Sequence, residues 1–259
     1  MQYLGLALYA EGSTDYQFLC PQLLRLCESA CAQAAQPVEI GGVLPLDDTH
    51  AMRAAPRGER IAQAAQEAAG AWNLLFVHAD ADGDAERALR ERVTPGLRRV
   101  GHAARPRAEG VAVVPVQETE AWVLADGDAL RAVFGSTLTD NALGLPAHVA
   151  AIEHLAEPKL ALQEAFLATR PTGRRARAGA TPLFNALGEQ VALHRLRALP
   201  SFRTLELGVC RALGRACAGA SFGASLGVGE AWDCPPQRAG NDGWHRKSPR
   251  PFGLKLAMG

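Results

Sequence analysis

Apolar residues in this chain occur in short continuous runs, and stretches with helical spacing follow them. The first run, residues 3–10, has the length of a strand, and a helical pattern starts at Ser13. The runs at 73–79 and 110–116 are also apolar almost throughout, which is typical of parallel strands covered by helices on both faces. A helical pattern follows each of them. This alternation predicts an α/β fold with a parallel central sheet.

Weaker patterns complete the first half of the chain. Residues 38–44 can form another strand, and the alanine-rich segment 58–70 and the segments 85–93 and 121–135 have helical spacing. Ser13 or Thr14 is expected to cap the first helix, because Thr14 and Gln17 have the spacing of a capping box.

The second half of the chain has no further strand pattern. Four helical segments are expected there, at 145–156, 158–170, 181–198 and 201–218. The segment 218–259 is rich in Gly, Pro and Ser, has no sustained period and reads as a flexible tail. We therefore predict three parts: an α/β domain at 1–135, a helical region packed on it at 136–217, and the tail at 218–259.

Composition restricts the class of protein more than its function. Hydrophobic residues make up 48% and charged residues 21%, as in a folded globular protein. The formal charge is +0, so a nucleic-acid partner would need a local basic patch. No apolar stretch reaches about 18 residues, and no basic segment precedes the first apolar run, so we expect a cytoplasmic protein without a membrane partner.

The six cysteines show no Cys-x-x-Cys spacing, and we interpret them as reduced core residues. They are Cys20, Cys27, Cys31, Cys210, Cys217 and Cys234.

Acidic residues follow three of the predicted strands. Glu11 comes after the first run, Asp80 and Asp82 after the run at 73–79, and Glu118 and Glu120 after the run at 110–116. Because the carboxyl ends of parallel strands form the binding crevice of an open α/β sheet, these side chains can converge. Converging carboxylates repel one another unless a cation neutralises them, and hard oxygen ligands suit Mg²⁺ or Mn²⁺.

Each of these signals also has a structural explanation. Asp80, Asp82 and Asp84 would equally suit the N-terminus of the helix that follows them. Gly83 can supply a turn that lets Asp80 and Asp82 face one metal ion. His78 can lie near that ion, although a histidine inside an apolar strand is more often a hydrogen-bonded core residue.

Two short motifs carry a family resemblance. EGSTD at 11–15 and DADG at 80–83 resemble the two defining motifs of the Toprim domain, a Glu after the first strand and a downstream Asp-x-Asp. ETEAWVLAD at 118–126, PK at 158–159 and LPSFR at 199–203 are similar to the bacterial Toprim-like proteins grouped as domain of unknown function 4276. The resemblance covers roughly residues 3 to 215.

The resemblance implies a Rossmann-like Toprim fold with a Mg²⁺ site. By motif, Glu11 is a general acid/base or a metal ligand, and Asp80 and Asp82 are metal ligands. Glu120 is similar to the additional catalytic or metal-binding acid of nuclease-type members, and Glu118 competes for that role. The chain departs from topoisomerases, because no separate domain with a nucleophilic tyrosine is evident.

Basic residues downstream are candidates for phosphate contacts. Lys159 follows Pro158 at an expected helix start, and it can contact a phosphate or simply lie on the surface. A predicted flexible loop carries four arginines that can neutralise phosphates or remain solvated: Arg170, Arg174, Arg175 and Arg177. Trp122 can stack on a base, but its apolar neighbours favour a core position.

These observations lead to two hypotheses of different class. The first is a Mg²⁺-dependent nuclease that hydrolyses DNA or RNA. Its resemblance to the overcoming-lysogenization-defect nucleases suggests a role in phage or mobile-element defence and a separately encoded ATPase as partner. The second is a non-catalytic module that uses the same fold to bind nucleic acid, nucleotide or a partner.

Overall fold

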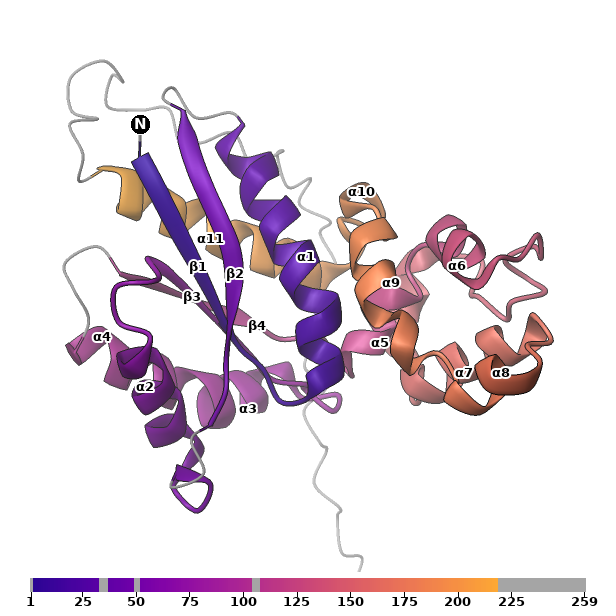
Figure 1. Ribbon diagram of the computed structural model, residues 1–259, viewed down its shortest axis with the longest axis horizontal. Coiled ribbons are helices and arrows are strands. Elements are labelled where there is room, and N and C mark those ends of the chain that lie inside the picture. The colour runs from indigo at the N-terminus through magenta and orange to yellow at the C-terminus, as the bar shows by residue number, and fades with distance from the viewer. Residues whose placement is uncertain (1, 33–36, 49–51, 104–107, 219–259) are drawn as a thin grey trace, which may run out of the picture.

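A four-stranded parallel sheet forms the centre of the protein (Figure 1). The computed structural model describes residues 2–32, 37–48, 52–103 and 108–218. The strands lie in the order β2-β1-β3-β4. They are β1 (Gln2–Tyr9), β2 (Val38–Leu46), β3 (Leu74–His78) and β4 (Glu109–Val113). The predicted α/β fold with a parallel sheet is confirmed.

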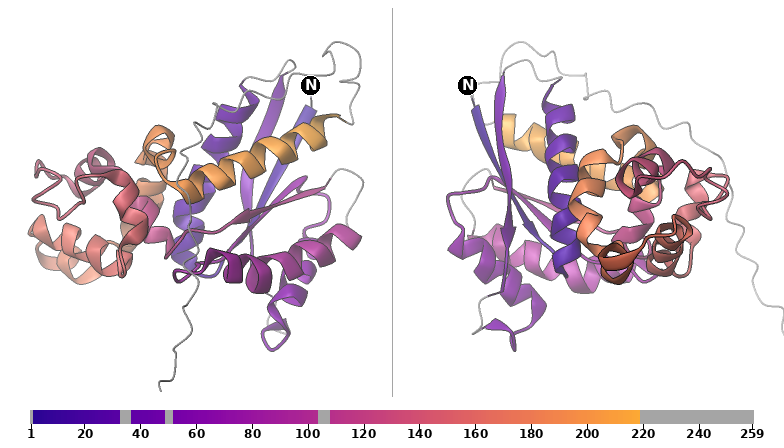
Figure 2. Two further views of the ribbon diagram at one scale, coloured as in Figure 1. Left: turned by 180° about the vertical axis from the view of Figure 1, so that it is seen from behind. Right: turned by 45° about the vertical axis from the view of Figure 1, so that its right-hand side comes forward.

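The side chains of β1 alternate between two cores, one on each face of the sheet. Leu6 and Leu8 belong to the larger core, which includes residues of α1 (Ser13–Cys31) and α11 (Pro200–Ala218). Ala7 and Tyr9 belong to the smaller core on the opposite face, with α2 (Arg57–Glu67) and α4 (Thr94–Ala103). Figure 2 shows the resulting three layers. Burial on both faces explains why the strands read as continuous apolar runs.

The first helix is capped differently from the prediction. It begins at Ser13 with Gly12 as its N-cap, and the Asp15 carboxylate accepts a hydrogen bond from the Gly12 N–H at 2.9 Å. The side chain that reaches back is therefore Asp15, in the third helical position, and the expected pairing of Thr14 with Gln17 is wrong.

The segment after β3 also differs in detail. A short α3 (Ala85–Ala88) runs through the π-helical turn η2 (Leu89–Val93) into α4, where we predicted one regular helix. Arg92 lies on this turn, so the turn bears on the site described below.

The described chain from Thr119 to Ala218 contains helices and no strand, as predicted. Before α11 these are α5 (Thr119–Val123), α6 (Gly127–Phe134), η3 (Val149–His154), α7 (Pro158–Ala168), α8 (Gly173–Ala178), η4 (Thr181–Leu183), α9 (Phe184–Gln190) and α10 (Leu193–Leu196).

Asp126 explains why two predicted continuous helices are broken. Its Oδ1 accepts hydrogen bonds from the N–H groups of Asp128 and Ala129 and so caps α6, which separates α5 from α6. Its Oδ2 accepts from the Ala192 N–H at 3.0 Å, between α9 and α10. One buried carboxylate thus interrupts the helical patterns at 121–135 and at 181–198.

The helical segment packs on the sheet layer through α1 and α9. Gly188 lies so close to α1 that a Cβ atom there would come within 2.5 Å of the Phe18 carbonyl oxygen. Gln22 donates to the Val191 carbonyl at 2.8 Å, and Arg25 donates to the same carbonyl at 2.9 Å. The division at 135/136 stays a prediction, and the predicted tail beyond residue 218 lies outside the described residues.

Trp122 and the cysteines were the other side chains for which the sequence favoured core positions. Trp122 is fully buried and donates from Nε1 to Ser201 Oγ at 2.9 Å, which confirms its core position. Cys27 is buried, and no disulfide joins Cys20, Cys27, Cys31 and Cys210 to one another. The side chain of Cys217 and the whole of Cys234 lie outside the described residues. Among the described helices, none is long and apolar enough to cross a membrane.

Candidate metal and phosphate site

The loops that follow β3 and β4 are hydrogen-bonded to each other at the carboxyl end of the sheet. The Ala81 N–H lies 3.1 Å from the Gln117 carbonyl oxygen, and the Gly83 N–H donates to the Val116 carbonyl at 2.8 Å. Since β1, β3 and β4 are neighbours, all five predicted acidic residues follow adjacent strands at this edge. Tertiary structure then decides which partner each carboxylate meets.

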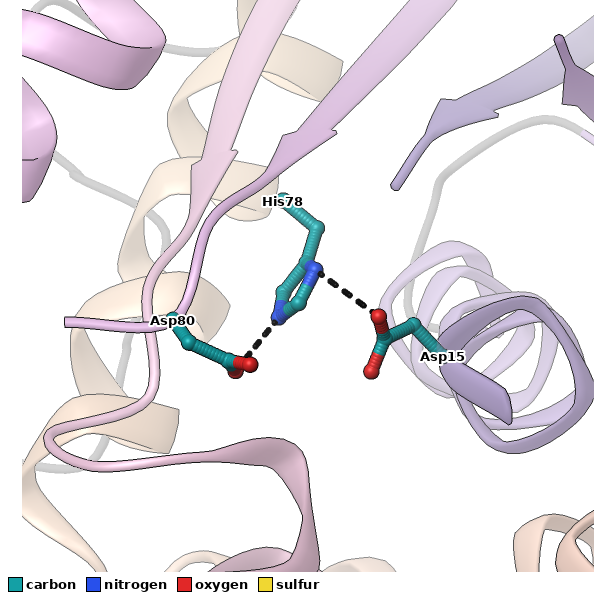
Figure 3. Close-up of side chains that lie close together, drawn as sticks. All are labelled: Asp15, His78 and Asp80. Atoms are coloured by element: carbon teal, nitrogen blue, oxygen red, sulfur yellow. Dashed lines mark hydrogen bonds and ion pairs between the residues drawn. The ribbon is translucent and has the colours of Figure 1, made fainter. Parts of the chain in front are cut away.

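Asp80 belongs to a cluster with Asp15 and His78 (Figure 3). His78 ends β3 and is fully buried; its Nε2 lies 3.1 Å from Asp80 Oδ1, and its Nδ1 lies 3.7 Å from Asp15 Oδ2. Thr119 also contacts both, since its N–H donates to Asp80 Oδ1 and its hydroxyl lies 3.1 Å from His78 Nε2. One ligand atom from each member of the cluster lies within 4.8 Å of the others, so this group can hold a metal ion.

Glu120 lies buried in the first turn of α5, beside this cluster. Burial raises the pKa of Glu120 to about 7, and the nearby negative charges of Glu118, Asp80 and Asp15 act in the same direction. A carboxyl group in this range exchanges its proton near neutral pH. The same set of charges would attract a divalent cation.

Glu11 and Asp82 meet arginines instead. Glu11 forms ion pairs with Arg57, at 3.1 Å, and with Arg92. Arg92 also donates to the Asp80 backbone carbonyl at 2.6 Å and lies 3.4 Å from Asp82 Oδ2. Asp82 has a left-handed backbone, with φ of 49°, and Gly83 has φ of 86°, so the predicted turn is present. This turn leaves the Asp82 carboxylate exposed and outside the cluster of Asp15, His78 and Asp80.

A cavity of about 520 Å³ opens next to Glu118 and Glu120. Its wall includes Thr14 of α1, Lys159 of α7 and Phe184 of α9. Apolar residues of α7 and of the segments before α7 and α9 complete much of the lining, namely Ala156, Leu160, Leu162 and Ala180. The cavity therefore combines an acidic wall, one cation and an apolar floor.

The four predicted phosphate-binding arginines lie elsewhere. Arg170 precedes α8, and the other three lie on α8, so the predicted flexible loop is largely a short helix. Arg175 donates to the Phe134 carbonyl at 2.7 Å and stacks over the Phe166 ring. All four residues are exposed, and none belongs to the described lining of the cavity.

Sequence reasoning missed Asp15, Arg57 and Arg92 and left His78 undecided. Asp15 stands inside the EGSTD motif, and its place in the first helical turn was the available signal. Arg57 and Arg92 carried no signal, because they reach the site only through the packing of α2 and η2 against the strand ends.

Comparison of the chain with protein-family models, curated proteins and solved structures finds no match.

Proposed function

We propose that this protein is a divalent-metal-dependent nuclease of the Toprim-like kind, which hydrolyses phosphodiester bonds in DNA or RNA. One observation carries the proposal: carboxylates that follow three adjacent parallel strands lie at one edge of the sheet, beside a cavity that contains a lysine. The carboxyl edge of an open parallel sheet is where such folds bind ligands. The motifs at 11–15 and 80–83 add the resemblance to the Toprim domain.

The residues present fit a divalent cation. Asp15, His78 and Asp80 offer closely spaced ligand atoms, and Glu118 and Glu120, for which the described residues supply no ion-pair partner, lie beside them. The carboxylates of this set suit Mg²⁺ or Mn²⁺. A metal ion held there would supply charge stabilisation for the phosphoryl group and help to activate a water molecule.

The side chains of the chain have separate roles in this proposal. The Lys159 ammonium group contacts a phosphate oxygen from the wall of the cavity. Glu120 accepts or returns a proton, because its pKa near 7 permits both states at neutral pH. Glu11, the general acid/base by resemblance, takes part only after its ion pairs with Arg57 and Arg92 open.

The arginines of α8 contribute binding rather than chemistry in this proposal. Arg170, Arg174 and Arg177 are exposed cations on or just before α8, and each phosphate that they neutralise adds to the salt dependence of binding. A separately encoded ATPase as partner and a role in phage defence rest on the family resemblance alone.

The test compares cleavage of plasmid DNA, linear duplex DNA and structured RNA in Mg²⁺, Mn²⁺ or EDTA. We expect metal-dependent cleavage by the parent and none by Asp80→Asn or Glu120→Gln. Glu86→Gln is the matched control, because Glu86 is an exposed acid on α3. Cleavage that survives in EDTA, or in both site variants, contradicts the proposal.

A binding module is the second candidate function, and the ion pairs that Glu11 and Asp82 form with arginines favour it. Glu11 and Asp82, two of the three acids of the Toprim motifs, are held by Arg57 and Arg92 in this structure. A module of this kind binds oligonucleotide or nucleotide without cleaving it under any of the metal conditions above. Binding without cleavage by the parent protein would select this candidate.

A further inference from the structure

His78 is a fully buried imidazole between two carboxylates, and only one of its nitrogens has a hydrogen-bond partner. Nε2 lies 3.1 Å from Asp80 Oδ1 and 3.1 Å from Thr119 Oγ1. Nδ1 has no partner within hydrogen-bond distance and points at Asp15 Oδ2, 3.7 Å away (Figure 3). Buried polar atoms without partners are uncommon, so this nitrogen requires an explanation.

The distances favour the tautomer of His78 with its N–H on Nε2, because Asp80 Oδ1 lies 3.1 Å from that nitrogen and Asp15 Oδ2 lies 3.7 Å from Nδ1. Asp80 Oδ1 accepts a hydrogen bond from the Thr119 N–H, and the remaining acceptor capacity suits an N–H on Nε2 of His78. In the neutral ring Nδ1 then carries a lone pair, which faces the Asp15 carboxylate. Two acceptors that face each other inside the protein are unfavourable unless a cation lies between them.

The gap between these two acceptors has the width that a metal ion requires. At 3.7 Å it is too long for a hydrogen bond. Metal bonds to histidine nitrogen and carboxylate oxygen are about 2.0 to 2.2 Å long, so one ion can touch both atoms. Asp15 is itself fixed by the hydrogen bond from the Gly12 N–H.

We propose that Asp15 and Nδ1 of His78 bind a divalent transition-metal ion of the Mn²⁺ class, and that the His78 nitrogen makes the site prefer this ion to Mg²⁺. Imidazole suits transition metals, whereas Mg²⁺ selects oxygen ligands. Asp80 orients the ring through Oδ1, as carboxylates beside metal-bound histidines do. The inference rests on the proposed function only in placing a metal ion at this crevice.

The ligand set differs from the one expected by motif. Glu11 and Asp82 were predicted to complete an all-oxygen site with Asp80. Their ion pairs with Arg57 and Arg92 supply positive charge on that side of Asp80 already. Asp15 and His78 replace them as ligands on the other side, where no arginine of the described chain pairs with either.

The test uses the full-length protein after metal removal, with Mn²⁺ as the probe. Electron paramagnetic resonance measures the affinity and stoichiometry of Mn²⁺, and pulsed electron-spin-echo measurement detects a nitrogen nucleus bonded to it. We expect one tightly bound Mn²⁺ per chain with imidazole nitrogen coupling, and only weak displacement by a large excess of Mg²⁺. His78→Asn should abolish the coupling and weaken Mn²⁺ binding about 10-fold or more, while Mg²⁺ binding changes less.

Two further variants keep the result interpretable. Asp15→Asn retains an oxygen that can accept from the Gly12 N–H, and it should weaken Mn²⁺ binding with the nitrogen coupling intact. His148→Asn is the matched control, because His148 is exposed, and it should leave binding unchanged.

Absence of bound Mn²⁺, or bound Mn²⁺ without nitrogen coupling in the parent protein, overturns the inference. Neither result depends on cleavage. A protein that binds Mn²⁺ through His78 and cleaves nothing would contradict the nuclease proposal alone, and a nuclease whose Mn²⁺ shows no nitrogen coupling would contradict this inference alone.

Discussion

The Nη1 atom of Arg57 lies 3.1 Å from Oε1 of Glu11, and Arg92 pairs with the other oxygen of the same carboxylate. The side chains of Arg57 and Glu11 are only 19% and 20% exposed. Arg57 also donates to the His78 carbonyl at 2.6 Å, so the same guanidinium joins α2 to the ends of β1 and β3. In this structure Glu11 is therefore part of a structural contact.

Glu11→Gln should destabilise the metal-free protein, because it leaves two largely covered guanidinium groups without their carboxylate. Loss of a hydrogen bond to a charged group costs about 1.5–3 kcal/mol, and we expect a decrease of that size in the free energy of unfolding. Urea unfolding in the presence of EDTA measures it. An unchanged or increased stability would show that carboxylate repulsion, and not the arginine contact, dominates at Glu11.

Glu120 should make the free energy of unfolding of the metal-free protein depend on pH. The unfolded chain titrates this group near its ordinary pKa, whereas burial raises the pKa in the folded protein to about 7. The folded state therefore binds more protons between these values, and stability falls as pH rises from about 4.5 to about 7. Above about pH 7 the folded protein bears the full cost of keeping the buried Glu120 carboxylate ionised, which is on the order of 3 kcal/mol.

The variant Glu120→Gln removes this titration. In metal-free buffer its urea-unfolding free energy should lack the decline between about pH 5 and pH 7 and should exceed that of the parent at pH 8. Glu86→Gln, at an exposed position on α3, should reproduce the decline of the parent. A parent protein without any decline would mean that Glu120 keeps an ordinary pKa.

Lys159 should act on substrate binding without a contribution to the fold. It lines the same cavity as Glu118 and Glu120 and can supply one phosphate contact. Lys159→Gln should weaken binding of a fluorescent oligonucleotide about 10-fold, which corresponds to about 1.4 kcal/mol, and should reduce its salt dependence. Lys159→Arg should retain most of the affinity.

The control for this prediction is Arg211→Gln, which removes an exposed cation on α11 outside the cavity. Equal losses from Lys159→Gln and Arg211→Gln would indicate that general charge, and not the cavity, determines the affinity.

Gly188→Ala should test the contact between α9 and α1. An added Cβ would lie 2.5 Å from the Phe18 carbonyl oxygen and 2.6 Å from Pro21, so the helices must separate. Overpacking of this kind costs about 1–3 kcal/mol. Thermal unfolding measures the loss, and Gly101→Ala, where a Cβ would meet no atom within 4 Å, should cost nothing. Equal stability of the Gly188→Ala variant and the parent would contradict the described contact.

Local patterns were sufficient for the strands and insufficient for the helical segment. Each strand except β2 is apolar on both faces because helices cover both, and such runs are visible without any knowledge of the partners. The helical patterns at 121–135 and 181–198 hid their breaks, because both depend on Asp126, whose carboxylate joins backbone groups distant in sequence. Nothing in the local sequence around Asp126 indicated that its side chain would cap one helix and contact the backbone of a distant segment.

The sequence by itself determined the parallel sheet and the placement of acidic residues after β1, β3 and β4, because period and strand length are local properties of the chain. Only the tertiary structure decided which side chains meet. Asp15 reaches His78 because α1 begins beside the end of β3. Glu11 meets Arg57 and Arg92 because α2 and η2 bring these two arginines to the end of β1. Such pairings depend on how distant elements cross, and no local period encodes that geometry.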